Sequence, residues 1–212
     1  MSKDTIFFDL DGTILDVSER VYQVYKIILK KYDKKFLSKK EYINLKKNKE
    51  PIVDILKKTG ADDILSRFNK EWAENIEKQD FLSLDKLSSL TKKFLLELSN
   101  NHELVLVTLR DSAKNLKTEL QEKKIENIFD KILVKSGKGI QEKWKIKYRL
   151  IKEYGNYKGS IFVGDTETDI LAGKELGLKT IAVTSGMRSR QFLEKHKPDL
   201  LVRDIFEINN IF

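Results

Sequence analysis

The stretch IFFDLDGTI, residues 6–14, decides how the rest of the chain is interpreted. Residues 5–8 form an apolar run that predicts a buried β-strand with no polar face. Asp9 and Asp11 follow this run directly, and Gly12 comes next. Ligands of open α/β sheets bind beyond the carboxyl ends of the strands, so we expect both acids to face a site. Gly12 permits the tight turn and close backbone approach that a bound phosphate requires, although Asp and Gly are also common in ordinary turns.

Five more apolar segments downstream have the character of strands: residues 103–108, 131–134, 160–164, 179–184 and 199–202. From residue 85 onward they alternate with segments of helical periodicity, at residues 85–99, 112–124, 141–154 and 168–176. This alternation predicts a parallel sheet with helices on both faces, joined by right-handed crossovers. The expected fold is therefore α/β, with a Rossmann-like parallel sheet.

Between the first strand and residue 85, only helical patterns appear, over residues 17–29, 38–47, 51–58 and 62–77. Pro51 suits the first turn of a helix, and Gly60 suits the end of one. We therefore expect an inserted α-helical cap, residues 16–85, joined by short hinges to a core made of residues 1–15 and 86–212.

The composition limits the chemistry and the partners. With 40% hydrophobic and 35% charged residues, the chain is typical of a soluble globular protein. It has no cysteine and two histidines, which favours a hard cation on oxygen ligands over a zinc site. No segment approaches the roughly 20 apolar residues that span a bilayer, and the start of the chain lacks a signal peptide's apolar region. We expect a cytoplasmic protein with no membrane partner.

The net charge of +8 is compatible with anionic substrates and with nucleic acid. The lysines are scattered over many segments, however, and no basic patch interleaved with aromatic residues appears. We therefore expect no nucleic-acid partner.

Several predicted strands end in groups that bind cations or phosphate. Asp9 and Asp11 follow the first strand, Thr108 ends the second, and Asp165 follows the fourth. Asp169 lies four residues after Asp165, in the first turn of the next predicted helix, so both can face one cation. Acids also serve as caps at helix N-termini, but capping does not explain why several strand ends carry such groups.

These motifs resemble those of the haloacid dehalogenase superfamily. DLDGT (residues 9–13) is similar to the family's first motif, Val107-Thr108 to its second, and GDTETD (residues 164–169) to its fourth. The helical insert resembles the cap of the phosphoglycolate phosphatase-like branch. The resemblance implies a Mg²⁺-dependent phosphatase that forms an aspartyl-phosphate and acts on a small phosphorylated metabolite, either phosphoglycolate-like or a sugar phosphate. We expect a monomer or a small homo-oligomer.

The resemblance also implies roles for individual residues. Asp9 would be the nucleophile, because a carboxylate that attacks phosphorus divides one difficult hydrolysis into two transfers. Asp11 would be the general acid and then the general base, and Thr108 would bind a phosphoryl oxygen. Asp9, the backbone carbonyl of Asp11, Asp165 and Asp169 would hold the Mg²⁺, which offsets the repulsion between carboxylate and phosphate.

Further substrate contacts are expected on both sides of the nucleophile. Backbone N–H groups of the turn from Leu10 to Gly12 suit a phosphate, and Leu109 follows Thr108 directly. The guanidinium of Arg110 suits a phosphate or a carboxylate, although exposure on the surface is the more ordinary expectation for this residue. In the insert, Lys46, Lys47 and Lys49 precede Pro51 on a loop that would cover the site.

The family also requires a lysine that balances the acids. We favour Lys143, which starts the helix before the fourth strand and lies twelve residues ahead of Gly155. Lys138, Lys145 and Lys147 remain alternatives in this lysine-rich segment.

Three other functions remain open. A phosphomutase would use the same aspartyl chemistry and return the phosphoryl group to a bound sugar, and the catalytic motifs do not distinguish it from a phosphatase. A signalling receiver also forms an aspartyl-phosphate, but needs neither Asp11 nor a cap. A non-enzymatic basic binding module would not require the set Asp9, Asp11, Thr108 and Asp165.

Overall fold

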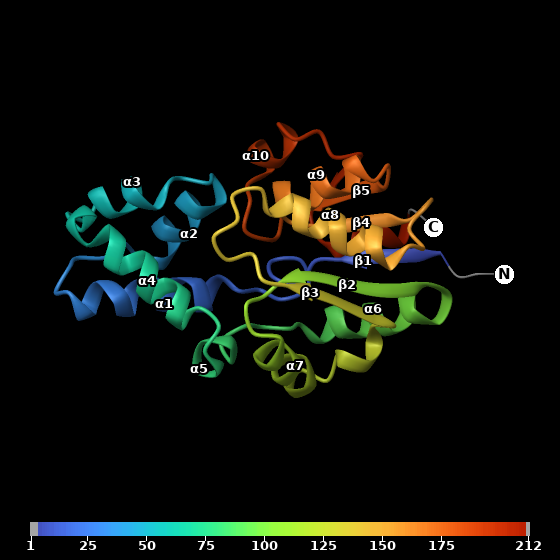
Figure 1. The fold of residues 1–212 in the computed structure, drawn as a ribbon, viewed down its shortest axis with the longest axis horizontal. Helices are drawn as coiled ribbons and strands as arrows, with labels where there is room; N and C mark the ends of the chain where they lie inside the picture. The colour runs from blue at the N-terminus through green and yellow to red at the C-terminus, as the bar shows by residue number, and fades with distance from the viewer. Residues whose placement is uncertain (1–3, 211–212) are drawn as a thin grey trace.

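The computed structural model describes residues 4–210 and consists of a parallel-sheet core with a helical unit beside it (Figure 1). The six strands are β1 (Thr5–Phe8), β2 (Glu103–Leu109), β3 (Lys131–Lys135), β4 (Ile161–Gly164), β5 (Lys179–Val183) and β6 (Leu200–Val202). Their order is β3-β2-β1-β4-β5-β6, and every neighbouring pair is parallel. The predicted α/β fold is confirmed, and the expected strand ends lie within one residue of those observed. Residues 1–3 and 211–212, which the predicted core range includes, lie outside the described residues.

Strand β1 lies at the centre of the sheet, and all four of its residues are buried. Ile6 and Phe8 pack into the apolar core on one face, whereas Phe7 packs on the other face, edge-on against Phe162. Successive side chains of a strand point to opposite faces. A run with no polar position is therefore what a strand covered on both faces requires.

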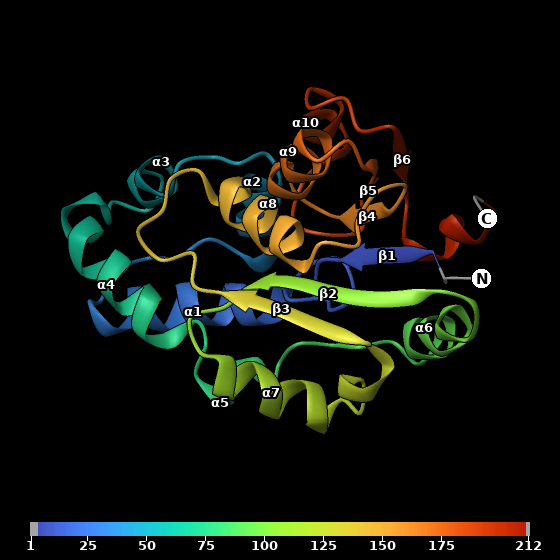
Figure 2. The same cartoon turned by 45° about the vertical axis from the view of Figure 1, so that its right-hand side comes forward.

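Helices cover both faces of the sheet (Figure 2). On one face lie α8 (Lys143–Tyr154) and α9 (Glu167–Glu175), with α8 against β2 and β3 and α9 against β4 and β5. On the other face lie α6 (Ser89–Asn101) and α7 (Ala113–Glu122). The structure also contains short elements that the sequence did not predict: α5 (Gln79–Leu82), α10 (Arg190–Glu194) and the 3₁₀ segments Glu126–Ile128 and Ile205–Asn210.

The predicted insert is helical throughout. It contains α1 (Ser18–Lys31), α2 (Lys39–Lys47), α3 (Ile52–Lys57), α4 (Leu65–Asn75) and α5 (Gln79–Leu82), with a 3₁₀ turn at Asp62–Ile64. Its interior is aromatic: the ring of Tyr25 stacks on that of Tyr42 at 4.0 Å between centroids. Across residues 4–210, no helix combines the length and the apolar character needed to cross a membrane.

Two backbone hydrogen bonds join the segments that connect the helical unit to the core. The N–H of Asp16 donates to the carbonyl of Lys86 at 2.9 Å, and the N–H of Lys86 donates back at 3.0 Å. These two residues border the insert expected at residues 16–85. The carboxyl ends of β1 and β2 point toward the helical unit, so the predicted site lies between the two parts (Figure 2).

Candidate active site

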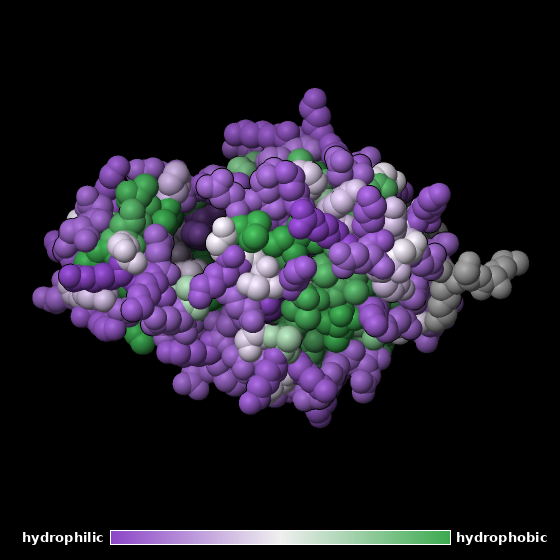
Figure 3. Space-filling view, viewed as in Figure 1, coloured by the Kyte–Doolittle hydropathy of each residue, from purple (hydrophilic) through white to green (hydrophobic). Residues whose placement is uncertain are grey.

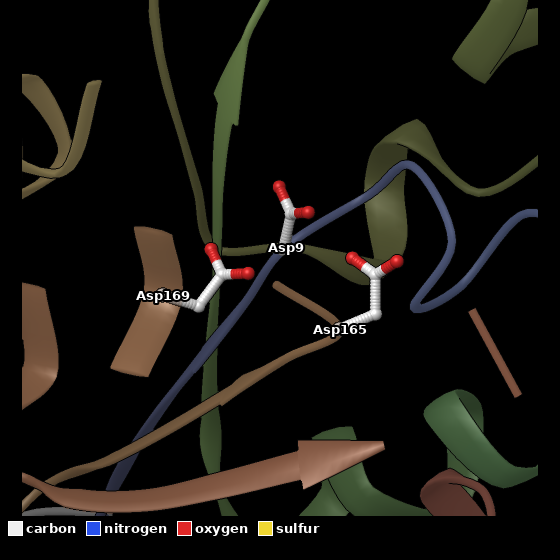
Figure 4. Close-up of side chains that lie close together, drawn as sticks. All are labelled: Asp9, Asp165 and Asp169. Atoms are coloured by element: carbon white, nitrogen blue, oxygen red, sulfur yellow. The ribbon is translucent and has the colours of Figure 1, made fainter. Parts of the chain in front are cut away.

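Three carboxylates come together at the carboxyl ends of β1 and β4 (Figure 4). Asp9 follows β1, and its N–H donates to the carbonyl of Val163 at 2.9 Å, which continues the pairing with β4. Asp165 follows β4, and Asp169 lies in the first turn of α9. All three acids are buried, and each offers an oxygen within 4.8 Å of the others. The structure therefore brings together the acids that the sequence predicts to share a cation.

Two glycines make room for the side chain of Asp165. A Cβ atom on Gly12 would lie 2.1 Å from Asp165 Oδ2, and one on Gly186 would lie 2.3 Å from the same oxygen. Gly12 also has a φ of +86°, which side-chain-bearing residues rarely adopt. The N–H of Met187 donates to Asp165 Oδ2 at 2.6 Å and fixes the carboxylate.

The expected role of Gly12 needs a correction. Its N–H, expected at the phosphate, instead donates to the carbonyl of Leu15 at 2.8 Å, so the turn itself uses this donor. Gly12 serves the site by leaving space for Asp165. The side chain of Leu10 is fully buried in the core.

The lysine that contacts the acids is Lys147, and not Lys143 as favoured from the sequence. Lys147 Nζ lies 2.6 Å from Asp9 Oδ1 and 2.5 Å from Asp169 Oδ1. Lys143 begins α8 and is exposed, whereas Lys147 lies one helical turn further along and is buried. Sequence spacing identifies the helix, but not which of its turns reaches the acids.

The other two lysine candidates do not contact the three acids. Lys138 borders the cavity that lies above the acids, and Lys145 pairs with Glu142 on the exposed side of α8.

Burial and mutual repulsion govern the charges of the acid cluster. Burial raises the pKa of Asp9 to about 7; the nearby Lys147 ammonium opposes this rise and the Asp169 carboxylate adds to it. Burial, together with the negative charges of Asp9 and Asp169, raises the pKa of Asp165 well above its usual range. Burial alone would lower the pKa of Lys147, but the carboxylates of Asp169 and Asp9 raise it above its usual range. One cation against three acids leaves a site that favours a further positive charge.

Asp11 is held between two arginines. Arg20 Nη2 lies 2.8 Å from Asp11 Oδ2, and Arg110 Nη2 lies 2.5 Å from Asp11 Oδ1. Burial would raise the pKa of Asp11, but the guanidinium groups of Arg110 and Arg20 outweigh it and lower the pKa to about 2. In this arrangement Asp11 is ionised at neutral pH and is engaged by cations.

Both arginines continue into a buried network that the sequence did not reveal. Arg20, on α1 of the helical unit, also pairs with Asp85 at 3.0 Å, and Arg110 pairs with Glu119 of α7 at 3.0 Å. Both arginine side chains are almost fully buried. One signal was available: Arg20 interrupts the apolar positions of the first predicted helix of the insert.

A cavity of about 710 Å³ lies above the acids, between the core and the helical unit. Figure 3 shows a recess between these two parts, with hydrophilic residues inside it and both hydrophilic and hydrophobic residues around it. From the core it is bordered by Asp9, Asp11, Thr108, Leu109, Arg110, Lys138, Lys143, Lys147 and Arg188, and from the helical unit by Arg20, Lys46, Trp72 and Glu77, among others. Thr108 thus borders the same cavity as Asp9, as the strand-end argument predicts. Leu109 and Arg110 border it too, and Arg110, for which exposure was the more ordinary expectation, is buried.

Comparison with known proteins agrees with this geometry. Residues 6–183 match the family model for haloacid dehalogenase-like hydrolases. The curated protein Pyrophosphatase PpaX of Oceanobacillus iheyensis is 26% identical, over all of this chain and 97% of that protein. A haloacid dehalogenase-like family protein from Streptococcus pneumoniae superposes with a TM-score of 0.81 at 21% identity, over 99% of this chain and 98% of its own. A predicted phosphoglycolate phosphatase from Haemophilus somnus superposes with a TM-score of 0.73 at 23% identity, over 100% of this chain and 98% of its own.

The family match covers most of the chain and contains the strands that carry Asp9, Thr108 and Asp165. It confirms the resemblance inferred from the motifs. The chain belongs to the haloacid dehalogenase-like hydrolase family.

Proposed function

We propose that this hydrolase is a Mg²⁺-dependent phosphatase that cleaves a small phosphoryl compound through an aspartyl-phosphate on Asp9. One observation carries the proposal: the buried Asp9 carboxylate borders a cavity and lies 2.6 Å from Lys147, in a cluster with Asp165 and Asp169. A carboxylate held against a cation at the floor of a cavity suits attack on a phosphoryl group.

The residues present fit a magnesium ion. Three buried carboxylates within 4.8 Å of one another supply the oxygen ligands that this cation prefers, and a single lysine does not balance them. Asp9, Asp165 and Asp169 would hold the ion, together with the backbone carbonyl of Asp11. When bound, Mg²⁺ supplies positive charge that offsets repulsion between the Asp9 carboxylate and a phosphate.

The chain's own residues account for the first transfer. An Asp9 oxygen forms a bond to phosphorus while the bond from phosphorus to the leaving oxygen breaks. Lys147 holds the Asp9 carboxylate in place through its ammonium group. Thr108, buried at the end of β2 and bordering the cavity, is placed to donate its hydroxyl to a phosphoryl oxygen.

Asp11 would give a proton to the leaving oxygen and later take one from the water that hydrolyses the aspartyl-phosphate. A carboxyl whose pKa lies at about 2 is a poor proton donor at neutral pH. The acid step therefore requires Asp11 to separate from Arg20 and Arg110. Because Arg20 belongs to the helical unit, a movement of that unit relative to the core would change this contact.

The candidate substrates are a phosphoglycolate-like compound, a sugar phosphate and inorganic pyrophosphate. The first two follow from the motifs and the helical insert, and the third from the name of the curated relative. All three compounds contain a phosphoryl group, and each is small enough to fit the cavity of about 710 Å³.

Phosphate release from a panel of phosphorylated metabolites, with and without Mg²⁺, tests the proposal. We expect turnover that requires Mg²⁺ and is lost in Asp9→Asn. Trapping of radioactive phosphate on the wild-type chain, but not on Asp9→Asn, would identify the intermediate. The proposal is wrong if a correctly folded chain releases no phosphate from any compound, or if Asp9→Asn retains the activity.

A further inference from the structure

The cavity that Asp9 borders is also lined by cations that the proposed chemistry does not use. We infer that Lys46, Lys143 and Arg188 form a second anion-binding subsite, which holds a phosphate or carboxylate on the leaving part of the substrate. The inference rests on the proposed function, and it narrows the substrate class to phosphoryl compounds with a second anionic group.

Lys46 is the central residue of this subsite. It lies in the last turn of α2, its side chain is half-buried, and its Nζ lies 5.9 Å from the centre of the Trp72 ring. Burial, together with the positive charges of Arg188 and Lys143, lowers the pKa of Lys46 to about 8. Within residues 4–210, no carboxylate pairs with Lys46 at ion-pair distance. A cation in this position gains from an anion that enters the cavity.

Arg188 is fixed beside Lys46 by contacts that cross from the core to the helical unit. Its Nε donates to Glu167 at 2.9 Å, and its Nη1 donates to the backbone carbonyl of Lys46 at 3.4 Å. Glu167 also pairs with Lys49 at 2.6 Å. The single charge of Glu167 is thus shared between two cations, which leaves this wall of the cavity with excess positive charge.

The same contacts hold the loop after α2 on the core. The N–H of Ser189 donates to the carbonyl of Lys47 at 2.9 Å, and the Ser189 hydroxyl donates to Asn48 at 2.8 Å. Lys46 is therefore presented by a docked segment, which preorganises the subsite for a ligand.

This arrangement favours a doubly anionic ligand over a phosphate ester with a neutral leaving part. The reacting phosphoryl group belongs at Asp9, which Lys147 already serves. Lys46 and Arg188 border the same cavity as Asp9. A neutral sugar would leave Lys46 without an anionic partner and Arg188 with only its share of Glu167, whereas the second phosphate of pyrophosphate or the carboxylate of phosphoglycolate would supply the missing negative charge.

Steady-state kinetics on two kinds of substrate test the subsite. Pyrophosphate and phosphoglycolate carry a second anion, whereas p-nitrophenyl phosphate carries an uncharged aryl group. We expect Lys46→Met to raise KM for the better of the two anionic substrates by about 10- to 100-fold and to change kcat/KM for p-nitrophenyl phosphate by about twofold at most. Lys46→Arg should have a KM close to that of the wild type, because the positive charge is kept. Lys40→Met, on the exposed side of α2, is the matched control and should match the wild type.

Direct binding provides a second measurement that needs no turnover. Calorimetry in the presence of Mg²⁺ would compare methylenediphosphonate with inorganic phosphate, using Asp9→Asn with and without Lys46→Met. We expect Lys46→Met to weaken the diphosphonate by about tenfold or more and to leave inorganic phosphate unchanged. An equal loss for both ligands, or no loss for the diphosphonate, overturns the subsite.

The outcomes separate this inference from the proposed function. If the wild type hydrolyses p-nitrophenyl phosphate with Mg²⁺ but Lys46→Met affects all substrates alike, only the subsite is wrong. If the wild type hydrolyses neither these three compounds nor any other compound of the phosphate-release panel, the phosphatase proposal itself fails. Preference for pyrophosphate or for phosphoglycolate in the first assay identifies which second anion the subsite takes.

Discussion

At the scale of single residues, the buried side chain of Arg20 is expected to make a large contribution to the stability of the folded protein. It is 2% exposed, and its guanidinium contacts both Asp11 and Asp85. We expect Arg20→Met to lower the free energy of unfolding by about 3–5 kcal/mol, because the buried Asp85 would lose its nearer cation at 3.0 Å and keep only Arg110 at 3.8 Å. Urea denaturation of the variant measures this loss.

The control for this prediction is Lys30→Met, an exposed position on the same helix, which we expect to stay within about 0.5 kcal/mol of the wild type. Asp85→Asn in the Arg20→Met background should recover part of the loss, because it removes the buried charge that has lost its nearer partner. A loss below about 1 kcal/mol for Arg20→Met would show that the network does not stabilise the native state.

Lys147 and Lys145, two residues apart on α8, form a matched pair that tests the proposed role of Lys147 in holding the nucleophile. Lys147 Nζ contacts Asp9 and Asp169, whereas Lys145 is exposed and pairs with Glu142. We expect Lys147→Met to reduce kcat by about 10²- to 10³-fold, because the cation beside the nucleophile is lost. Lys145→Met should leave kcat within about twofold of the wild type.

Phosphate release under saturating substrate measures both variants, with circular dichroism as the check on folding. If Lys143→Met abolished kcat while Lys147→Met retained it, the assignment from sequence would be right and the one from the structure wrong. We expect Lys143→Met to act on KM instead, since Lys143 belongs to the proposed anion subsite.

At the scale of elements, the loop after β5 closes against the turn after β1. A Cβ on Gly186 would lie 2.4 Å from the Asp165 Cβ and 2.5 Å from the carbonyl oxygen of Gly12. The backbone at Gly12 cannot yield as a flexible side chain would. We therefore expect Gly186→Ala to destabilise the protein by about 1–3 kcal/mol and to displace the Asp165 carboxylate.

A displaced Asp165 should weaken Mg²⁺ binding by about 10- to 100-fold, which calorimetry on the folded variant measures. Ser185→Ala is the control, because Ser185 is exposed and directly precedes Gly186. Unchanged metal affinity in Gly186→Ala would show that the loop after β5 does not position Asp165.

The elements also show what the sequence can and cannot predict. Strand β1 was predictable because a strand buried on both faces has no polar position, and Asp9 and Asp165 were predictable because they directly follow such strands. The pairing of Arg20 with Asp11 was not predictable, because it depends on how α1 packs against the core. The choice of Lys147 over Lys143 likewise depends on how far α8 extends over the sheet.

At the scale of the whole molecule, the buried acids link stability to pH and to metal. Burial raises the pKa of Asp9 from its ordinary value of 3.8 to about 7, so without metal the native state binds this proton more tightly than the unfolded chain. The contribution of Asp9 to stability is therefore fully present below about pH 4 and is lost as the pH rises toward 7. Asp165 shifts in the same direction, which reinforces the trend.

Magnesium should reverse this trend, because it binds the ionised acids of the native state. At a concentration 100-fold above its Kd, we expect a gain of about 2.7 kcal/mol, which raises the Tm of a chain of this size by roughly 5–11 °C. Melting curves in Mg²⁺ and in EDTA measure the gain. This gain in stability should shrink as the pH falls below about 7, where protons compete with the metal for Asp9.

The variant Asp165→Asn should lose most of the gain. The control is Asp199→Asn, which should keep the gain, because Asp199 lies outside the acid cluster and accepts a hydrogen bond from Thr180. A gain that persists in Asp165→Asn, or one that grows toward acidic pH, would place the metal elsewhere in the molecule.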